Sequence, residues 1–467
     1  MIEYEQFVET KLSRIPPTGM TSIPQLSESL FPFQRDLVRW ALRRGRCALF
    51  AATGLGKSRM QVEWARHVVS HTQGRVLVLA PLAVSNQTAE EAAKLGVCAQ
   101  VCRDASEIDA KIVISNYERL HRFDPRSFDG VVCDESSIIK HKDSKTLRML
   151  LDAFRDTQFK LCATATPSPN DYTELGTHAE FLGICTSQEM LAEYFCHDGG
   201  ETQVWRLKGH ARAEFWRWVA SWGALVRAPS DLGYDDGGYA LPPLHVHEHI
   251  IPADKATVQA AGLLFAAPAG DLTERRTARR ASLRARVSEC VARVNANSRP
   301  WVVWCDLNDE SDALTAAIDG AIEVRGSMDV DDKESRIRSF LDGKSRVLVT
   351  KPSIAGFGLN LQFCSDMGFV GVTDSWEAYH QAVRRIWRFG QKQECNVHIW
   401  ASEVEGSVVA NLKRKEADAI KMANELSRET GAVVRDEVLG QRRSTNEYSN
   451  RALSMPAWLS RRTPDAD

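Results

Sequence analysis

A short apolar run, a glycine turn and a helical segment follow one another between residues 46 and 69, and this stretch limits the possible fold most. Residues 47–51 are apolar, the turn reads Thr53-Gly54-Leu55-Gly56, and apolar side chains recur at helical spacing from Met60. A strand that leads through such a turn into a helix is the setting of a phosphate-binding loop. Glycine lets backbone N–H groups curl around phosphates, and the helix N-terminus adds a positive dipole end. Ala51 replaces the usual first glycine, so a glycine loop of an unrelated α/β domain is the alternative.

The start of this helix supplies the side chains that phosphate chemistry requires. Lys57 would reach the β- and γ-phosphates of a nucleoside triphosphate, and the Ser58 hydroxyl would ligate Mg²⁺. Gln34 begins a predicted amphipathic helix over residues 30–42, and its amide could bind adenine, although a lone Gln is more often an ordinary polar residue. We therefore expect the nucleotide to contact Gln34, Thr53, Gly54, Leu55, Gly56, Lys57 and Ser58.

Length, charge and cysteine usage narrow the class of protein. The 467 residues suffice for two to three domains, each with its own core. The formal net charge is −2, so a nucleic-acid partner would have to be held by a local basic groove. The eleven cysteines include no Cys-x-x-Cys pair, which is typical of reduced thiols in a cytosol-like compartment. The sequence has no signal-peptide profile and no apolar run of membrane-spanning length, so we expect a cytoplasmic protein without a membrane partner.

Three further apolar runs, at residues 75–81, 111–117 and 130–135, each end in polar residues. Their continuity indicates buried parallel strands in βαβ alternation, where functional residues lie at the carboxyl ends of the strands. Asp134 and Glu135 occupy that position. Asp134 would hold Mg²⁺, and Glu135 would orient and polarise the attacking water. Adjacent acids can also be plain turn residues, but their place downstream of a phosphate loop favours the catalytic interpretation.

Residues 183–295 interrupt the strand alternation. Several large apolar side chains fall near one helical face and could stack on bases, although a satellite core is the favoured interpretation; they are Phe215, Trp218, Trp222 and Leu225. A basic segment could track phosphates or be a solvated helix face; it contains Arg275, Arg276, Arg279, Arg280, Arg284 and Arg286. Three alternating histidines would share one face of a strand, but without a further ligand cluster a metal site is disfavoured; they are His245, His247 and His249.

A second alternating unit begins at residue 300. Its predicted strands and helices lie at residues 300–306, 310–318, 321–324, 333–341, 345–350, 367–372 and 379–391. On the last helix, arginines and a glutamine recur at spacings of three and four; they are Gln381, Arg384, Arg385 and Arg388. Gln381, one or other of Arg384 and Arg385, and Arg388 can therefore point the same way. Because no matching acids accompany these guanidinium groups, they need an anionic partner, and phosphate is the best candidate.

The order of these motifs resembles superfamily 2 helicases, and within them the Swi/Snf-type ATPases in the compact form common in bacteriophages and prophages. The similarity covers about residues 30–395 and rests on Gln34, residues 52–58, Ala80-Pro81, Asn116-Tyr117, Asp-Glu-Ser-Ser at 134–137, Thr-Ala-Thr-Pro at 164–167, Gly-Phe-Gly-Leu-Asn-Leu at 356–361 and residues 381–391.

This resemblance implies roles for residues of the second half. Arg385 and Arg388 would reach across to ATP, and Gly356 would lie near the nucleotide. The family commonly has an acid where this chain has Arg384, so the role of that position is open. Surfaces near residues 80–87, 116–117 and 353–360 would contact a nucleic-acid backbone.

We therefore expect an α/β fold with two RecA-like parallel-sheet lobes in tandem and a mostly helical insertion between them. The expected division is an irregular lead-in at 1–25, lobe 1 at 26–182, a helical insertion or linker at 183–295, lobe 2 at 296–435 and a polar tail at 436–467.

The expected function is an ATP- and Mg²⁺-dependent DNA helicase or translocase, with Ser58 and Asp134 as metal ligands. Its catalytic residues would be Lys57, Asp134, Glu135, Arg385 and Arg388. The alternatives are a duplex translocase or remodeller that separates no strands, and a nucleotide-gated DNA-binding module. Duplex or forked DNA is the expected partner, RNA is a weaker candidate, and the compartment would be a bacterial or phage-infected cytosol.

Overall fold

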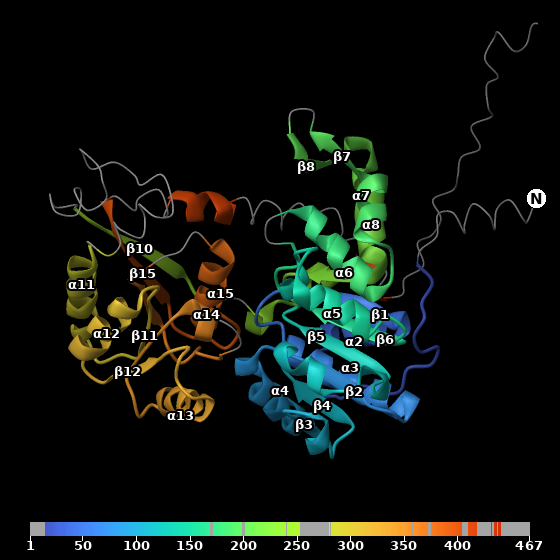
Figure 1. Cartoon of the computed structure of the whole chain (residues 1–467), viewed down its shortest axis with the longest axis horizontal. Helices are drawn as coiled ribbons and strands as arrows, with labels where there is room; N and C mark the ends of the chain where they lie inside the picture. Colours follow the sequence, from blue (N-terminus) through green and yellow to red (C-terminus); the bar gives the residue numbers. More distant parts are fainter. Residues whose placement is uncertain are drawn as a thin grey trace, which may run out of the picture.

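The computed structural model contains two α/β lobes that lie side by side, with the first half of the chain in one and the second half in the other (Figure 1). It describes residues 15–439 except 169–170, 199–200, 240, 253–279, 281, 356–358, 372–374, 404–409, 418–430, 432–433 and 437. This architecture confirms the expected pair of parallel-sheet lobes. Among the described residues, no helix is long and apolar enough to span a membrane.

Lobe 1 is built on a sheet in which all neighbouring strands are parallel, in the order β3-β4-β2-β5-β6-β1-β9. The strands are β1 (Arg46–Ala51), β2 (Val76–Leu79), β3 (Ala99–Val101), β4 (Ile112–Ser115), β5 (Gly130–Asp134), β6 (Phe159–Ala163) and β9 (Gly223–Val226). The associated helices are α2 (Pro32–Arg44), α3 (Lys57–Thr72), α4 (Leu82–Lys94), α5 (Lys145–Ala153) and α6 (Leu175–Leu182). Two apolar clusters, one on each face of the sheet, bury these strands, which explains their continuous apolar sequence.

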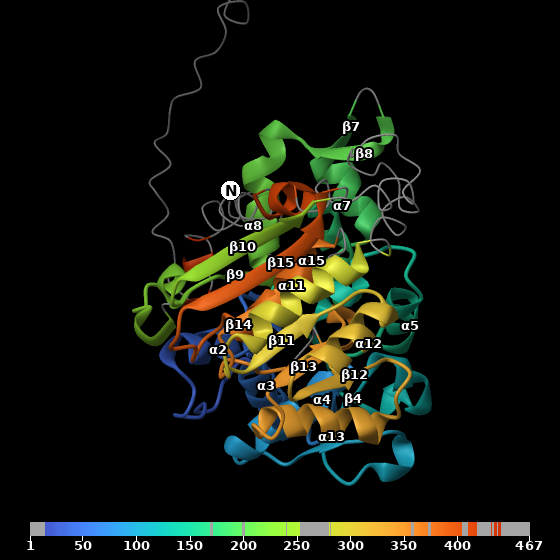
Figure 2. The ribbon, with the colours of Figure 1, turned by 90° about the vertical axis from the view of Figure 1, so that its left-hand side faces the viewer.

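Lobe 2 repeats this plan with a parallel sheet in the order β10-β15-β14-β11-β13-β12 (Figure 2). The strands are β10 (Leu244–Ile251), β11 (Trp301–Trp304), β12 (Ala321–Val324), β13 (Val347–Thr350), β14 (Asp366–Phe369) and β15 (Cys395–Ser402). The helices are α11 (Leu283–Asn295), α12 (Asn308–Ala317), α13 (Val330–Leu341), α14 (Pro352–Ala355) and α15 (Trp376–Ile386). Strand β15 was absent from the sequence-based expectation, although it lies between β10 and β14 in the sheet.

The segment between the lobes differs from the expected helical insertion over residues 183–295. Helices α7 (Ser187–Tyr194) and α8 (Arg212–Trp222) flank an antiparallel hairpin of β7 (Phe195–Asp198) and β8 (Glu201–Leu207), which projects from lobe 1 (Figure 1). Beyond α8, β9 pairs with β1 and β10 pairs with β15, so both strands belong to the lobes. The inter-lobe segment is therefore shorter than the expected 183–295, because β9 belongs to lobe 1 and β10 to lobe 2. The sequence of a short strand does not indicate which sheet it joins; only its pairing partner does.

The aromatic side chains of α8 form a core, as favoured from the sequence. Phe215 and Trp222 are fully buried and pack with the apolar cluster that includes Phe50 of β1. The arginines of the basic segment that the structure describes differ in their exposure to solvent. Arg280 and Arg284 are exposed, whereas Arg286 is buried in an ion pair with Glu310 at 2.8 Å. Arg275, Arg276 and Arg279 lie outside the described residues.

The last described residues return to lobe 1. Val434 and Val438 are 2% and 3% exposed and belong to the same apolar cluster as Leu37 and Trp64. The expected lobe 2 boundary at residue 435 therefore cuts through a segment that packs on lobe 1.

The alternating histidines lie on β10 and stack against its neighbour β15. His247 stacks on His398 with ring centroids 4.6 Å apart, and His249 Nε2 lies 2.9 Å from His398 Nδ1. His249 also stacks on Trp400. No cluster of three potential metal ligands occurs among the described residues, so this ladder is an aromatic stack at the edge of lobe 2.

We predict that this ladder makes lobe 2 sensitive to acid. Burial, together with the nearby His247 and Arg293, lowers the pKa of His398 from 6.5 to about 3. Protonation therefore favours the unfolded chain, so stability present above pH ~6.5 is lost as the pH falls. At about pH 5.5 the loss is about 1.4 kcal/mol for this residue. Urea unfolding at pH 8 and pH 5.5 should show a smaller pH difference in His398→Gln than in the wild type.

The matched control is His245→Gln, because His245 is half exposed on the same strand. This variant should keep the wild-type pH difference. An unchanged difference in His398→Gln would contradict the assignment of acid sensitivity to the ladder.

Candidate nucleotide site between the lobes

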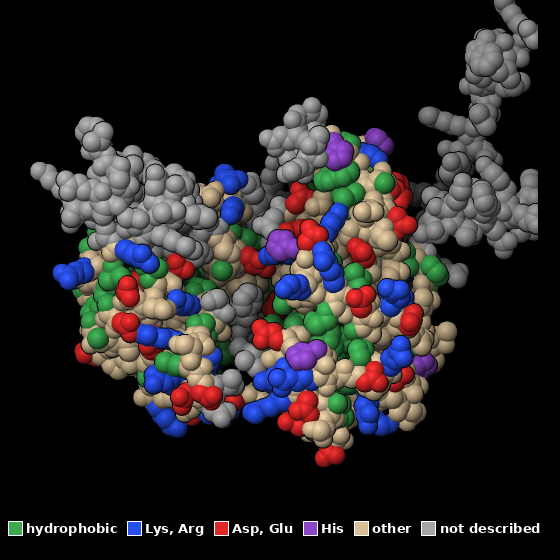
Figure 3. Space-filling model, viewed as in Figure 1, with side chains coloured by type: hydrophobic (Ala, Val, Ile, Leu, Met, Phe, Trp, Pro, Cys, Tyr) green, Lys and Arg blue, Asp and Glu red, His purple; other side chains and the backbone are tan. Residues whose placement is uncertain are grey.

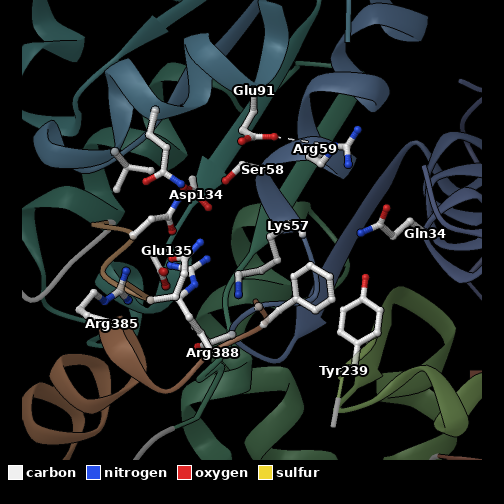
Figure 4. Close-up of a pocket in the computed structure, with 18 of the residues that line it drawn as sticks. Gln34, Lys57, Ser58, Arg59, Glu91, Asp134, Glu135, Tyr239, Arg385 and Arg388 are labelled. Atoms are coloured by element: carbon white, nitrogen blue, oxygen red, sulfur yellow. Dashed lines mark ion pairs between the residues drawn. The ribbon is translucent and has the colours of Figure 1, made fainter. Parts of the chain in front are cut away.

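A cavity of about 360 Å³ lies between the lobes and collects most of the predicted site residues (Figure 4). Its lobe 1 wall includes the glycine turn, the start of α3 and the end of β5, and its lobe 2 wall includes the residues that follow α15. The predicted nucleotide contacts that line it are Gln34, Thr53, Gly54, Gly56, Lys57 and Ser58. Leu55 instead points into the core and is 3% exposed.

The glycine turn has the conformation of a phosphate-binding loop. Gly54 and Gly56 have φ angles of 95° and 80°, which a side chain would disfavour, and α3 begins immediately afterwards at Lys57. Lys57 Nζ donates a hydrogen bond to the Ala51 carbonyl at 2.9 Å. Burial lowers the pKa of Lys57, while Glu135 and Asp134 oppose that shift. The ammonium group is therefore held in the loop and faced by two acids.

Asp134 ends β5 and is held in place by two polar side chains. Gln61 Nε2 donates to Asp134 Oδ1 at 2.5 Å, and the Tyr117 hydroxyl donates to the Asp134 carbonyl at 2.6 Å. Burial and the neighbouring Glu135 raise the pKa of Asp134 to about 6. Such a buried carboxylate gains from a cation beside it.

Glu135 adopts a conformation that residues with side chains rarely take. Its φ and ψ are 48° and 50°, in the left-handed region, and one of its carboxylate oxygens is buried with no hydrogen-bond partner in the described part of the chain. Strain of this kind persists only where the surrounding structure enforces it, and it is concentrated at functional sites.

Ser136, the residue after Glu135, connects this strained turn to helix α6. Ser136 Oγ and His178 Nε2 of α6 lie 3.1 Å apart, and both residues are fully buried. Burial lowers the pKa of His178 to about 4, so the imidazole is neutral at physiological pH. The turn is thus connected to α6, which leads into the projecting hairpin.

Lobe 2 contributes two arginines to the cavity, as predicted. Arg385 donates from Nη2 to Gln381 Oε1 at 2.9 Å, and burial lowers its pKa while Glu135 and Asp134 oppose the shift. Burial likewise lowers the pKa of Arg388 to about 10, so it stays charged at neutral pH. Its Nε atom is buried and has no partner among the residues described.

The Arg384 side chain does not point into the nucleotide cavity. Its guanidinium carbon lies 4.4 Å from the ring centroid of Trp387, and the side chain lines an adjoining, mainly apolar cavity. Of the neighbours Arg384 and Arg385, it is therefore Arg385 that lines the nucleotide cavity together with Arg388. Neighbouring positions on a helix lie about 100° apart, and Arg385 is the one that meets the lobe 1 acids. Gly356 lies outside the described residues.

Gln34 is buried and already hydrogen bonded within the protein. Its Nε2 donates to the Leu55 carbonyl at 2.8 Å, and its Oε1 accepts from the Phe31 N–H at 3.0 Å. It thereby ties the start of α2 to the glycine turn.

Three aromatic side chains of the cavity escaped the sequence-based prediction: Phe31, Tyr239 and Phe389. They come from segments far apart in the sequence. Phe389 lies within the motif at residues 381–391, whereas Phe31 and Tyr239 lie outside the motifs given above.

The donor set of the cavity fits ATP and Mg²⁺. Backbone N–H groups, Lys57 and two arginines suit a triphosphate, and the Ser58 hydroxyl with the Asp134 carboxylate would hold the metal. Four residues that line the cavity also carry a buried polar atom without a partner in the described part of the chain; they are Glu135, Asn360, Gln362 and Arg388. Unsatisfied polar atoms of this kind are rare in folded proteins and are concentrated where function requires them.

Comparisons with family models match the two lobes separately. The family model described as "Type III restriction enzyme, res subunit" matches residues 27–169, which hold the glycine loop and both acids. The model described as "Helicase conserved C-terminal domain" matches residues 288–390, which hold both arginines. The chain therefore carries both halves of a superfamily 2 helicase core, a nucleic-acid-dependent ATPase.

No curated protein matches the sequence of this chain. Among solved structures, the chain is similar to the SWI2/SNF2 ATPase core of Sulfolobus solfataricus, which was solved in complex with double-stranded DNA. The identity is 16% and the TM-score 0.41, and the similarity covers 90% of this chain and 99% of that chain.

Proposed function

We propose that this protein is a Swi/Snf-type motor that couples ATP hydrolysis between its two lobes to movement along DNA. The observation that carries the proposal is the shared cavity, in which Glu135 of lobe 1 faces Arg385 and Arg388 of lobe 2. Neither lobe alone supplies both a base and charge stabilisation, so hydrolysis depends on how the lobes are arranged.

Each residue has a distinct part in this mechanism. Bound Mg²⁺ neutralises phosphate charge when present. The glycine turn and Lys57 hold the triphosphate by N–H donation and by charge. Glu135 orients the attacking water and accepts its proton, while Arg385 and Arg388 donate to the transferring phosphoryl group.

Polar contacts across the lobe boundary include three pairs among the described residues. Lys140 pairs with Glu377 of α15, Arg338 of α13 pairs with Glu90 at 3.9 Å, and Asn86 Nδ2 donates to Glu334 Oε1 at 2.6 Å. Closure around the nucleotide and reopening after hydrolysis would shift the lobes against each other, and a DNA backbone held by both would be advanced.

The DNA must be held locally, because acidic and basic side chains are interspersed over the face shown in Figure 3. The proposed contacts are the surfaces near residues 80–87, 116–117 and 353–360. One of the matched family models is named for a restriction enzyme, a class that acts on DNA. A cytosolic setting is supported by the eleven cysteines, which are all free.

The test is ATP hydrolysis with single-stranded, duplex, forked and RNA ligands, with Lys57→Ala as the background rate. Duplex DNA should stimulate the wild type most. Triplex displacement without release of a strand from a forked duplex would establish a translocase rather than a strand-separating helicase. No turnover with any ligand would instead support a nucleotide-gated binding module and would contradict the proposed motor.

We predict that Tyr117 connects the proposed DNA surface to the metal-binding acid. In Tyr117→Phe the Asp134 carbonyl loses its buried donor, which should lower the free energy of unfolding by about 1–2 kcal/mol. If the connection transmits DNA binding, the ratio of DNA-stimulated to basal ATPase rate should also fall. The exposed neighbour Glu118→Gln is the control and should change neither quantity.

A further inference from the structure

A second cavity adjoins the nucleotide cavity, and we call it the apolar cavity. Its volume is about 570 Å³, compared with about 360 Å³ for the nucleotide cavity. Lobe 1 lines it with residues of β1 and β9, such as Phe50 and Leu225, and lobe 2 lines it with residues of α15, such as Trp376 and Val383. This size and these largely apolar walls are typical of sites for small organic ligands.

The apolar cavity shares part of a wall with the nucleotide cavity but differs from it in chemistry. Thr53, Tyr239 and Phe389 line both cavities. The residues proposed to bind the triphosphate and the metal line the nucleotide cavity only; they are Lys57, Ser58, Asp134, Arg385 and Arg388. A ligand of the apolar cavity would therefore meet a different set of groups from the phosphates of a nucleotide.

Arg384 brings a positive charge to these apolar walls. Its guanidinium carbon lies 4.4 Å from the ring centroid of Trp387, and its Nε donates to His380 Nε2 at 3.4 Å. Burial lowers the pKa of Arg384 to about 10, so the side chain is still charged at neutral pH.

This charge has no acidic partner within the described part of the chain. Glu416 lines the same cavity but forms no ion pair with Arg384, and the two terminal nitrogens of Arg384 have no hydrogen bond to any residue that the structure describes. Charged groups in apolar surroundings are normally paired, because their transfer from water is costly. Two free terminal nitrogens form the planar fork of donors that matches a carboxylate.

The groups beside Arg384 on α15 are flat. Trp376, His380 and Arg384 recur every four residues and so share one face of the helix. Trp376 and His380 stack with ring centroids 4.7 Å apart, and Arg384 stacks on Trp387. Burial and the neighbouring Arg384 lower the pKa of His380 to about 3, so its ring is neutral at neutral pH. A flat, apolar ligand would make extensive contact with such a surface.

We propose that the apolar cavity binds a small aromatic carboxylate, whose carboxylate pairs with Arg384 and whose ring packs against the walls from both lobes. This assigns a role to the position that the resemblance to Swi/Snf-type ATPases leaves open, because the family commonly has an acid there. The proposal depends on the arrangement of the two lobes and not on ATP hydrolysis. It would therefore stand if the proposed motor function failed.

The test is titration calorimetry on the full chain without nucleotide, with cinnamate as the probe. Cinnamamide is the matched neutral ligand, because it has nearly the same shape and no charge. It should bind the wild type about tenfold more weakly than cinnamate, since it cannot form the charge-assisted pair. Arg384→Gln should weaken cinnamate binding by about the same factor and leave cinnamamide binding within about twofold.

Three further variants locate the bound cinnamate. Lys392→Gln removes an exposed positive charge from the same lobe outside both cavities, and it should keep the wild-type affinity. Arg388→Gln changes the nucleotide cavity only, so cinnamate binding should stay within about twofold. Trp387→Leu removes part of the aromatic wall and should weaken cinnamate and cinnamamide alike. Thermal melting shows whether each variant is folded.

Several outcomes would overturn the proposal. One is an absence of cinnamate binding at millimolar concentration, and another is equal affinity of the wild type for cinnamate and cinnamamide. Unchanged cinnamate binding in folded Arg384→Gln would also contradict it. Weakening by Arg388→Gln would place the probe in the nucleotide cavity instead. If Arg384→Gln fails to fold, unchanged binding of both probes in Trp387→Leu would be decisive against the apolar cavity.

Discussion

Glu135→Gln should lower kcat for ATP hydrolysis by about 10²–10⁴-fold and leave ATP binding nearly unchanged. The amide keeps the size of the carboxylate but cannot accept the proton of the attacking water. Asp134, Lys57 and the glycine turn remain in place to hold the nucleotide. Single-turnover hydrolysis and equilibrium ATP binding, measured on the same preparation, separate the two effects.

The control for this variant is Glu118→Gln, an exposed acid outside the cavity, which should keep the wild-type rate. A kcat for Glu135→Gln within about tenfold of the wild type would show that another group activates the water. Loss of ATP binding would instead mean that the strained turn at Glu135 depends on the carboxylate for its shape.

Removal of Arg388 should be at least as severe, although this residue lies in the other lobe. Arg388→Ala should lower kcat by about 10³–10⁵-fold, because a guanidinium on the transferring phosphoryl group stabilises charge that develops in the transition state. Affinity for ATP should change far less, since lobe 1 supplies the glycine turn and Lys57. Pre-steady-state hydrolysis, with ATP binding measured in parallel, is the appropriate experiment.

Arg384→Ala is the matched control, because Arg384 lies in the last turn of α15, close in sequence to Arg388, but stacks on Trp387 outside the nucleotide cavity. It should retain a rate within a few-fold of the wild type. Arg388→Lys should recover little activity, since an ammonium lacks the planar fork of donors. If Arg384→Ala were as inactive as Arg388→Ala, the loss would reflect disturbance of the helix rather than of the cross-lobe contact.

The local part of this architecture was predictable from the sequence. The strands that build both sheets are continuous apolar runs because they are covered on both faces, and Lys57, Ser58, Asp134 and Glu135 directly follow such runs or the glycine turn. A catalytic residue that directly follows a strand can be predicted from the residues next to it in the sequence. The acids at the end of β5 can therefore be predicted from the sequence itself, and the pair of lobes and the roles of Arg385 and Arg388 from the resemblance to superfamily 2 helicases.

The non-local part was not predictable for a physical reason. Strands β9 and β10 are short, and only their pairing with β1 and β15 assigns them to opposite lobes. The rings of Phe31, Tyr239 and Phe389 come from distant parts of the sequence, and they meet only once both lobes are folded. Arg384 and Arg385 are neighbours in sequence, and packing alone decides which one meets the acids.

The return of the chain to lobe 1 restricts how the two lobes can move. The chain leaves lobe 1 after β9, builds the lobe 2 sheet from β10 to β15, and then buries Val434 and Val438 in the lobe 1 core. Lobe 2 is thus tethered at both of its ends rather than hung from a single linker. Any displacement of lobe 2 during closure must therefore be accommodated by two connections, one before β10 and one after β15.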